Sequence, residues 1–68
     1  MRTYGKLREA IRKKYGTLGA FSVSMGMNLS TLSAKVNGNS AWRQDEIEKS
    51  CHLLGISLTD VYDYFFYE

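Results

Sequence analysis

Apolar side chains recur along the first part of the chain at steps of three and four residues, which is the spacing of one face of an α-helix. The first such run predicts a helix over residues 4–14 that stops at Gly16, because glycine favours the left-handed conformation that ends helices. Lysine and arginine occupy the other faces of this helix. Its expected inner side chains are Tyr4, Leu7, Ile11 and Tyr15.

The next two apolar runs predict two short helices in close succession. One covers residues 18–25, begins after the N-cap Thr17 and ends at Gly26. The other begins after the N-cap Asn28 and extends to about Asn37. The expected inner side chains are Phe21 and Met25 in the first of these helices, and Leu29, Leu32 and Val36 in the second.

The opposite face of this third helix is short-chained and polar. Serine, threonine and asparagine are mediocre helix formers, so their concentration here indicates a face made for contact with another molecule. The face has no carboxylate and can therefore approach phosphates without repulsion. It consists of Ser30, Ala34 and Asn37 at its centre, with Thr31, Ser33 and Lys35 at its edges.

A fourth helix is predicted after the loop 38–44, with an acidic first turn that suits the helix dipole, and it ends at Gly55. Its expected inner side chains are Ile47, Cys51 and Leu54. Trp42 is expected to pack on the seam between the loop and this helix. A fifth short helix is predicted to follow, capped by Ser57 or Thr59. It would contain Leu58, Val61 and Tyr62.

Length and composition fit one small all-α domain, a five-helix bundle over residues 1–68. The chain has no proline and is 44% hydrophobic, so a packed core is expected rather than disorder. No apolar run reaches the roughly 18 residues that a membrane-spanning helix needs, and the basic N-terminus lacks the apolar segment of a signal peptide. The single cysteine cannot form an internal disulfide. We therefore expect a cytoplasmic protein with no membrane partner.

The net charge of +2 conceals a strong asymmetry. Residues 1–43 carry eight Lys or Arg and one acid, a balance of +7, whereas residues 44–68 carry one lysine and six acids, a balance of −5. A basic half of this kind is typical of proteins with a polyanionic partner such as nucleic acid. It is equally compatible with a solvated basic helix balanced by an acidic tail.

The second and third predicted helices, joined by a tight glycine-containing turn, form a helix-turn-helix. In this motif the second helix enters the major groove of DNA while the first crosses the backbone. Several short segments that together span nearly the whole chain carry a resemblance to a known family. They are KYGT at 14–17, Phe21, MGMN at 25–28, TLSAKVNG at 31–38, QDEI at 44–47, LLGIS at 53–57 and YFF at 64–66. In these segments the sequence resembles the phage repressor and Cro family of helix-turn-helix proteins, in particular short phage-encoded Cro-like proteins.

The resemblance implies a phage or prophage regulator in a bacterial host, associated with the nucleoid, that binds double-stranded operator DNA as a homodimer and represses by occupancy. It implies phosphate or backbone contacts for Asn28 and Asn37, and base contacts for Ser30 and Ala34. The full set of implied DNA-contacting residues is Thr17, Asn28, Ser30, Thr31, Ser33, Ala34, Lys35, Asn37, Asn39 and Arg43.

Two positions depart from the family pattern. Leu18 stands where the family often has a phosphate-binding glutamine, and Ala34 has no hydrogen-bonding side chain. An alanine can contact a thymine methyl group, but it cannot make the bidentate contacts that discriminate a base by about 1–3 kcal/mol. Readout would then depend on the remaining polar side chains and on DNA shape.

Enzymatic chemistry finds little support in the sequence. Cys51 and His52 are neighbours, so on a helix their side chains diverge by about 100° and cannot form a catalytic dyad. One cysteine and one histidine do not make a zinc site, and no phosphate-loop or dinucleotide fingerprint is present. We expect no enzymatic activity, cofactor, metal or small-molecule ligand.

The alternative interpretation is a protein-interaction role. Leu18, Ala20 and Val23 place apolar atoms on parts of the second helix that a solvated helix would make polar, and the C-terminal segment is rich in aromatic residues. Aromatic clusters are typical of interfaces. The expected interface residues are Tyr64, Phe66 and Tyr67. In the simplest case they join a homodimer; in the other, the protein is an antirepressor that binds another phage repressor instead of DNA.

Overall fold

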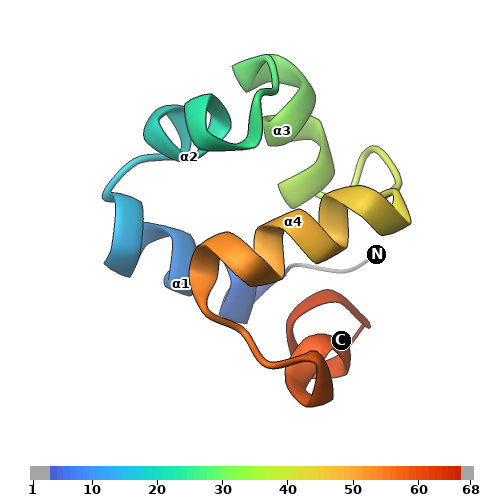
Figure 1. Cartoon of the computed structure of the whole chain (residues 1–68). Helices are drawn as coiled ribbons and strands as arrows, with labels where there is room; N and C mark the ends of the chain where they lie inside the picture. The colour runs from blue at the N-terminus through green and yellow to red at the C-terminus, as the bar shows by residue number, and fades with distance from the viewer. Residues whose placement is uncertain (1–3, 67–68) are drawn as a thin grey trace.

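The chain folds into four α-helices followed by two short helical segments (Figure 1). The computed structural model describes residues 4–66. The elements are α1 (Gly5–Tyr15), α2 (Leu18–Met25), α3 (Leu29–Val36), α4 (Gln44–Leu54), a 3₁₀ turn η1 (Leu58–Asp60) and a π-helical turn η2 (Tyr62–Phe66). The predicted small all-α bundle is confirmed. Within residues 4–66, no helix has the length and apolar character needed to cross a bilayer.

Helix boundaries follow the local sequence signals. The side chain of Thr17 accepts a backbone N–H of the first turn of α2 at 3.1 Å, and that of Asn28 does the same for α3 at 3.1 Å, so both predicted N-caps are confirmed. Gly26 ends α2 with a φ of 70°, and Gly38 follows α3 with a φ of 80°. Glycine adopts such positive φ values without steric strain.

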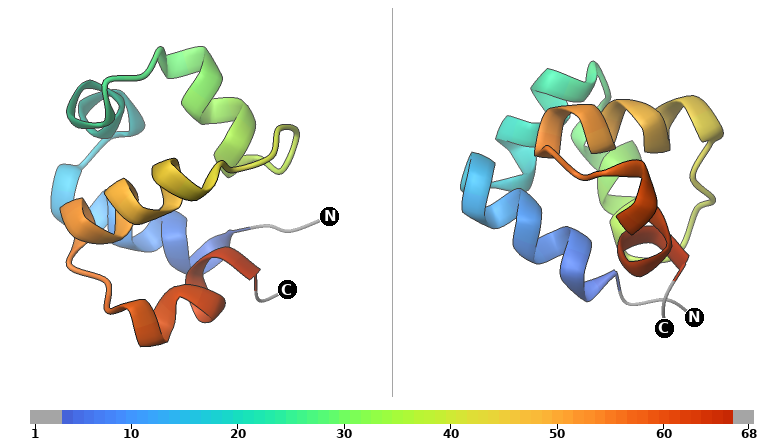
Figure 2. Two further views of the ribbon diagram at one scale, coloured as in Figure 1. Left: turned by 45° about the vertical axis from the view of Figure 1, so that its right-hand side comes forward. Right: turned by 60° about the horizontal axis from the view of Figure 1, so that its bottom comes forward.

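The core is formed by side chains from all four α-helices and from η2. In Figure 1 and the left view of Figure 2, α2 and α3 lie on one side of α1 and α4, and η1 and η2 lie on the other. Burial of apolar surface is the main stabilising contribution in such a small domain. The largest fully buried apolar side chains are Phe21, Phe65, Leu7, Leu32 and Val36. The inner side chains predicted for α2, Phe21 and Met25, are confirmed.

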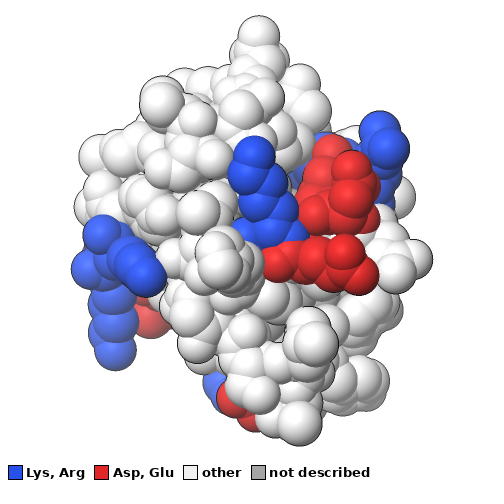
Figure 3. Space-filling model, in the orientation of Figure 1, with Lys and Arg blue, Asp and Glu red and all other residues white. Residues whose placement is uncertain are grey.

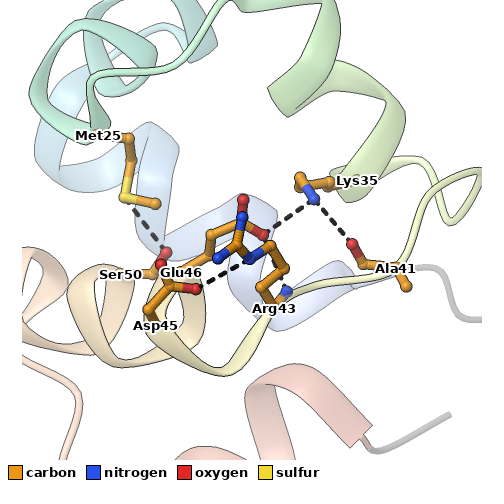
Figure 4. Close-up of polar contacts among 7 residues, drawn as sticks. All are labelled: Met25, Lys35, Ala41, Arg43, Asp45, Glu46 and Ser50. Atoms are coloured by element: carbon orange, nitrogen blue, oxygen red, sulfur yellow. Dashed lines mark hydrogen bonds and ion pairs between the residues drawn. The ribbon is translucent and has the colours of Figure 1, made fainter.

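Two predicted inner faces need correction. Leu29 is 49% exposed, because it is the first residue of α3 and precedes the part of the helix that crosses the core. In α4, Ile47 and Leu54 are only half-buried, although both pack against the core. The buried positions of α4 are Cys51, as predicted, and Ser50, whose hydroxyl donates to the sulfur of Met25 at 3.5 Å (Figure 4). Because serine is polar, apolar periodicity does not identify this position as buried.

The C-terminal segment departs from the predicted single fifth helix. Ser57 caps the short turn η1, and the chain then widens into the π-helical turn η2. This directs Phe65 into the core, whereas Tyr62 and Phe66 stack on each other at the surface with 6.4 Å between ring centroids. Trp42 packs edge-on against Phe65, at 5.1 Å between centroids. Its position therefore depends on η2 as well as on α4.

Phe65→Ala is expected to lower the free energy of unfolding by about 3–5 kcal/mol, because it removes a fully buried aromatic side chain and leaves a cavity beside Trp42. Leu58→Ala is the control, since Leu58 is 76% exposed and its truncation should change stability by no more than about 0.5 kcal/mol. Urea unfolding followed by circular dichroism measures both. Equal losses in the two variants would contradict the assignment of Phe65 to the core.

Candidate nucleic-acid interface

The connection between α2 and α3 has the short length of the turn in a helix-turn-helix. It consists of three residues, Gly26, Met27 and Asn28. The N–H groups of the first two donate to carbonyls in the last turn of α2, which satisfies the end of that helix. From α4, Lys49 Nζ donates to the carbonyl of Met25 at 3.2 Å, so a third helix also holds the turn.

The predicted contact residues at the start of α3 lie on the surface. Asn28, Ser30 and Thr31 are exposed. Asn28 Oδ1 accepts hydrogen bonds from the N–H of Ser30 at 3.1 Å and from its hydroxyl at 2.9 Å. Ser33 and Ala34, in the middle of the helix, are half-buried. A large ligand would therefore meet the first turn of α3 before it meets these two residues.

At the other end of α3, Asn37 and Asn39 are exposed. The side-chain amide of Asn37 donates to the hydroxyl of Ser33 at 3.2 Å, and its oxygen accepts from the guanidinium of Arg8 in α1. The backbone N–H of Asn39 donates to the carbonyl of Ala34 at 2.8 Å. The end of α3 is thus fixed by its own loop and by α1.

Lys35 is the one predicted contact residue that lies inside the fold. It is only 5% exposed. Its Nζ lies 2.9 Å from the carboxylate of Glu46 and donates to the carbonyl of Ala41 at 2.8 Å (Figure 4). The prediction that Lys35 lies on the outward face and meets phosphate is therefore wrong, because a phosphate cannot reach an ammonium group enclosed by α3, the loop and α4. The aliphatic stem of lysine makes such burial possible.

Glu46 completes this buried pair. Its carboxylate also accepts the backbone N–H of Arg43 at 2.9 Å, so it caps α4 from within. Burial raises the pKa of Glu46, but the hydrogen bonds from Arg43 and Lys35, with the charges of both side chains, outweigh it, and the resulting pKa is below the ordinary value. The carboxylate is therefore charged at neutral pH and links α4 to α3.

The burial of Lys35 leaves α2 and α3 without an accessible charged side chain. No other Lys, Arg, Asp or Glu occurs in residues 15–42, and the top of the molecule over α2 and α3 is white in Figure 3. Two apolar side chains protrude from these helices instead, Val23 at 79% exposure and Leu29. Any positive charge offered to a ligand on this face must come from its edges.

One edge is formed by Arg43, at the start of α4. Its guanidinium is exposed and pairs with Asp45 at 3.3 Å (Figure 4). The predicted position of Arg43 after the loop is therefore accessible. An ion pair between two exposed side chains contributes little to stability, so Asp45 does not prevent Arg43 from meeting another anion.

The other edge is an open groove of about 290 Å³ between α1, the start of α2 and the end of α3. It brings together the predicted contact residues Thr17 and Asn37, which are distant in sequence. Arg8 and Arg12 of α1 also line it, although neither is among the contact residues predicted from the sequence. Their spacing of four residues puts them on one face of α1, but nothing in the sequence indicates that this face meets α3.

The expected interface residues lie apart from this groove. Tyr64 is half-buried, with the Lys6 ammonium group 5.8 Å from its ring centroid. Phe66 is exposed beside Tyr62, and Tyr67 lies outside the described residues.

Burial raises the pKa of the Cys51 thiol, in keeping with its place in the core. Across residues 4–66, no three His, Cys, Asp or Glu side chains are grouped so that they could hold a metal ion.

Comparison with known proteins gives a family for this chain. Residues 2–68 match the family described as "Protein of unknown function (DUF739)". The chain belongs to the DUF739 family. The match extends through every element from α1 to η2. No curated protein matches this DUF739 member, and its resemblance to the Cro family stays a prediction.

Lys35→Ala is expected to lower the free energy of unfolding by about 3 kcal/mol, because it leaves the Glu46 carboxylate without its partner. This is the low end of the range for buried pairs, since the Glu46 side chain retains 18% of its accessible surface. The control is Arg43→Ala, which breaks an exposed pair and should cost less than about 1 kcal/mol. Chemical denaturation distinguishes them, and equal small losses would contradict a structural role for Lys35.

The contribution of this pair is expected to disappear in acid. Because the pKa of Glu46 is lower in the fold than in the unfolded chain, the stabilisation is complete above the ordinary glutamate pKa of about 4.3 and is lost as the pH falls through the lowered pKa. The stability difference between the wild type and Lys35→Ala should shrink over this interval. A difference that persists unchanged in acid would exclude Glu46 as the partner that matters.

Proposed function

We propose that this DUF739 protein is a sequence-specific DNA-binding regulator of phage or prophage origin, which reads operator DNA with α3 in the major groove. The observation that carries the proposal is the exposed polar face at the start of α3, which is free of carboxylates and follows a turn of helix-turn-helix length. In such proteins the N-terminal residues of the second helix contact base edges. Here these residues are Asn28, Ser30 and Thr31.

The proposed readout combines few hydrogen bonds with apolar contacts. The hydroxyl groups of Ser30 and Thr31 can donate to or accept from base edges, and Leu29 and Ala34 can meet thymine methyl groups. Because these contacts are individually weak, sequence-dependent DNA shape is expected to add to specificity. Repression would follow from occupancy of the operator, so activity would depend on protein concentration.

A homodimer fits this proposal, because helix-turn-helix proteins commonly bind two half-sites about 34 Å apart. A second groove, on the side of η1 and η2, offers apolar surface for a second copy. It is lined by Trp42, Ile47, Leu58, Val61 and Phe66, among others. The resemblance to Cro-like proteins implies dimers as well.

The test is fluorescence anisotropy of the purified protein on the intergenic DNA beside its own gene and on a scrambled duplex, at several salt concentrations. Preferential binding to its own region with a steep salt dependence supports an operator-binding regulator. Equal and weak binding to both duplexes would contradict the proposal.

Ser30→Ala is expected to weaken operator binding about two- to tenfold, because it removes one hydrogen bond worth about 0.5–1.5 kcal/mol. Binding to the scrambled duplex should change less, since Ser30 is proposed to contact bases. Thr59→Ala is the matched control, because it removes an exposed hydroxyl on η1, away from α3. Unchanged operator affinity in Ser30→Ala would be strong evidence against α3 as the reader.

A second candidate function is binding to another phage repressor in place of DNA. The specific observation in its favour is the uncharged surface of α2 and α3, from which Val23 and Leu29 protrude. Contiguous exposed apolar patches are typical of protein interfaces, and these two side chains would contribute to one. A monomer that binds a repressor but no DNA would establish this function and exclude the first.

A further inference from the structure

A polyanion on α3 must find its positive charge at the edges of the uncharged surface. Of the basic residues in α1, only Arg8 reaches α3: its Nε donates to the carbonyl of Val36 at 3.4 Å, and its guanidinium donates to Asn37. Arg12 lines the same groove one helical turn further along α1. The end of α3 therefore contacts one guanidinium group and shares a groove with a second.

The groove has the donors that a phosphate requires. Besides the two arginines, its described lining contains Thr17 and Asn37, which have polar side chains, three apolar residues and no carboxylate. The first turn of α2, which borders it, has no acidic residue. Guanidinium groups suit phosphate oxygens because their N–H groups form a planar fork that can donate two parallel hydrogen bonds.

We propose that Arg8 and Arg12, together with Thr17 and Asn37, form a clamp for one phosphodiester group of the DNA backbone. This clamp rests on the DNA-binding function proposed above and adds the α1 face to it. Arg8 is held in place by its hydrogen bonds to Val36 and Asn37, so it forms the fixed side of the groove. Arg12 is the exposed half: its side chain is 74% exposed and pairs with Glu9 at 3.2 Å, a contact that a phosphate replaces.

The neighbouring lysines of α1 provide an internal control. Lys13 and Lys14 carry the same charge, but they line a different groove, together with Leu54 and Tyr64 on the side of α4 and η2. A phosphate held beside the end of α3 contacts Arg12 and not Lys13. General attraction to DNA would instead depend on both residues equally.

The experiment compares Arg12→Gln with Lys13→Gln, both of which remove one exposed charge from α1. DNA binding is measured by anisotropy between low and moderate salt, on the intergenic and scrambled duplexes, after circular dichroism has shown that both variants are folded. Arg12→Gln should reduce the salt slope by about 0.9 and the affinity at 0.1 M salt by about 5–10-fold, on both duplexes alike. Lys13→Gln should leave the slope unchanged.

Equal slope changes in both variants, or no change in either, would overturn the clamp. A free-phosphate site is distinguished by titrating the protein with inorganic phosphate at constant ionic strength while the Arg12 Nε–H resonance is followed by NMR. Saturation by inorganic phosphate at millimolar concentration would also overturn the assignment to the DNA backbone, whereas a shift produced only by duplex DNA supports it.

The two proposals fail in different ways. The ratio of affinities for the two duplexes tests sequence-specific binding, whereas the difference in slope between Arg12→Gln and Lys13→Gln tests the clamp. If the protein binds the two duplexes equally but the salt slopes of Arg12→Gln and Lys13→Gln still differ, the clamp stands and sequence-specific binding is contradicted. Glu9→Gln should have the opposite effect on DNA affinity: it removes the partner of Arg12 and should strengthen DNA binding.

Discussion

The buried pair of Lys35 and Glu46 is the interaction on which the rest of this surface depends. It joins the last turn of α3 to the first turn of α4, and the ammonium group also binds the loop carbonyl of Ala41. Buried pairs are expensive to desolvate, so geometry rather than net energy is their main contribution. In this protein the pair fixes the position of α3 relative to α4. It also removes the single charge of α3 from the surface.

The electrostatics of the molecule follow from that burial. A protein with a basic half would be expected to attract DNA through its reading helix, but α2 and α3 offer hydroxyl, amide and apolar groups alone. Under the proposed function, attraction and recognition would be divided between elements: arginines at the edges would supply charge, and α3 would supply the groups that distinguish one sequence from another.

Local signals in the sequence were sufficient to predict α1 to α4, but not the form of the C-terminal segment or the contacts between helices. Caps such as Thr17 and Asn28 and the terminating glycines act within one turn, so the limits of α2 and the start of α3 could be predicted. The burial of Lys35 could not, because a helical wheel treats every lysine as polar and ignores its long apolar stem. The choice of Phe65 among several aromatic neighbours is likewise made by α1 and Trp42, which lie far away in sequence.

The contact of η2 with α1 has a consequence for the order of folding. α1, α2 and α3 pack as successive neighbours, so they can assemble through short loop closures. Tyr4 and Phe65, which both flank Trp42, come from opposite ends of the chain and meet only when the whole chain has closed. We therefore expect the helices that carry the polar face to form first and the C-terminal segment to dock last. During synthesis the nascent chain would then form the exposed polar face of α3 before Phe65 completes the core.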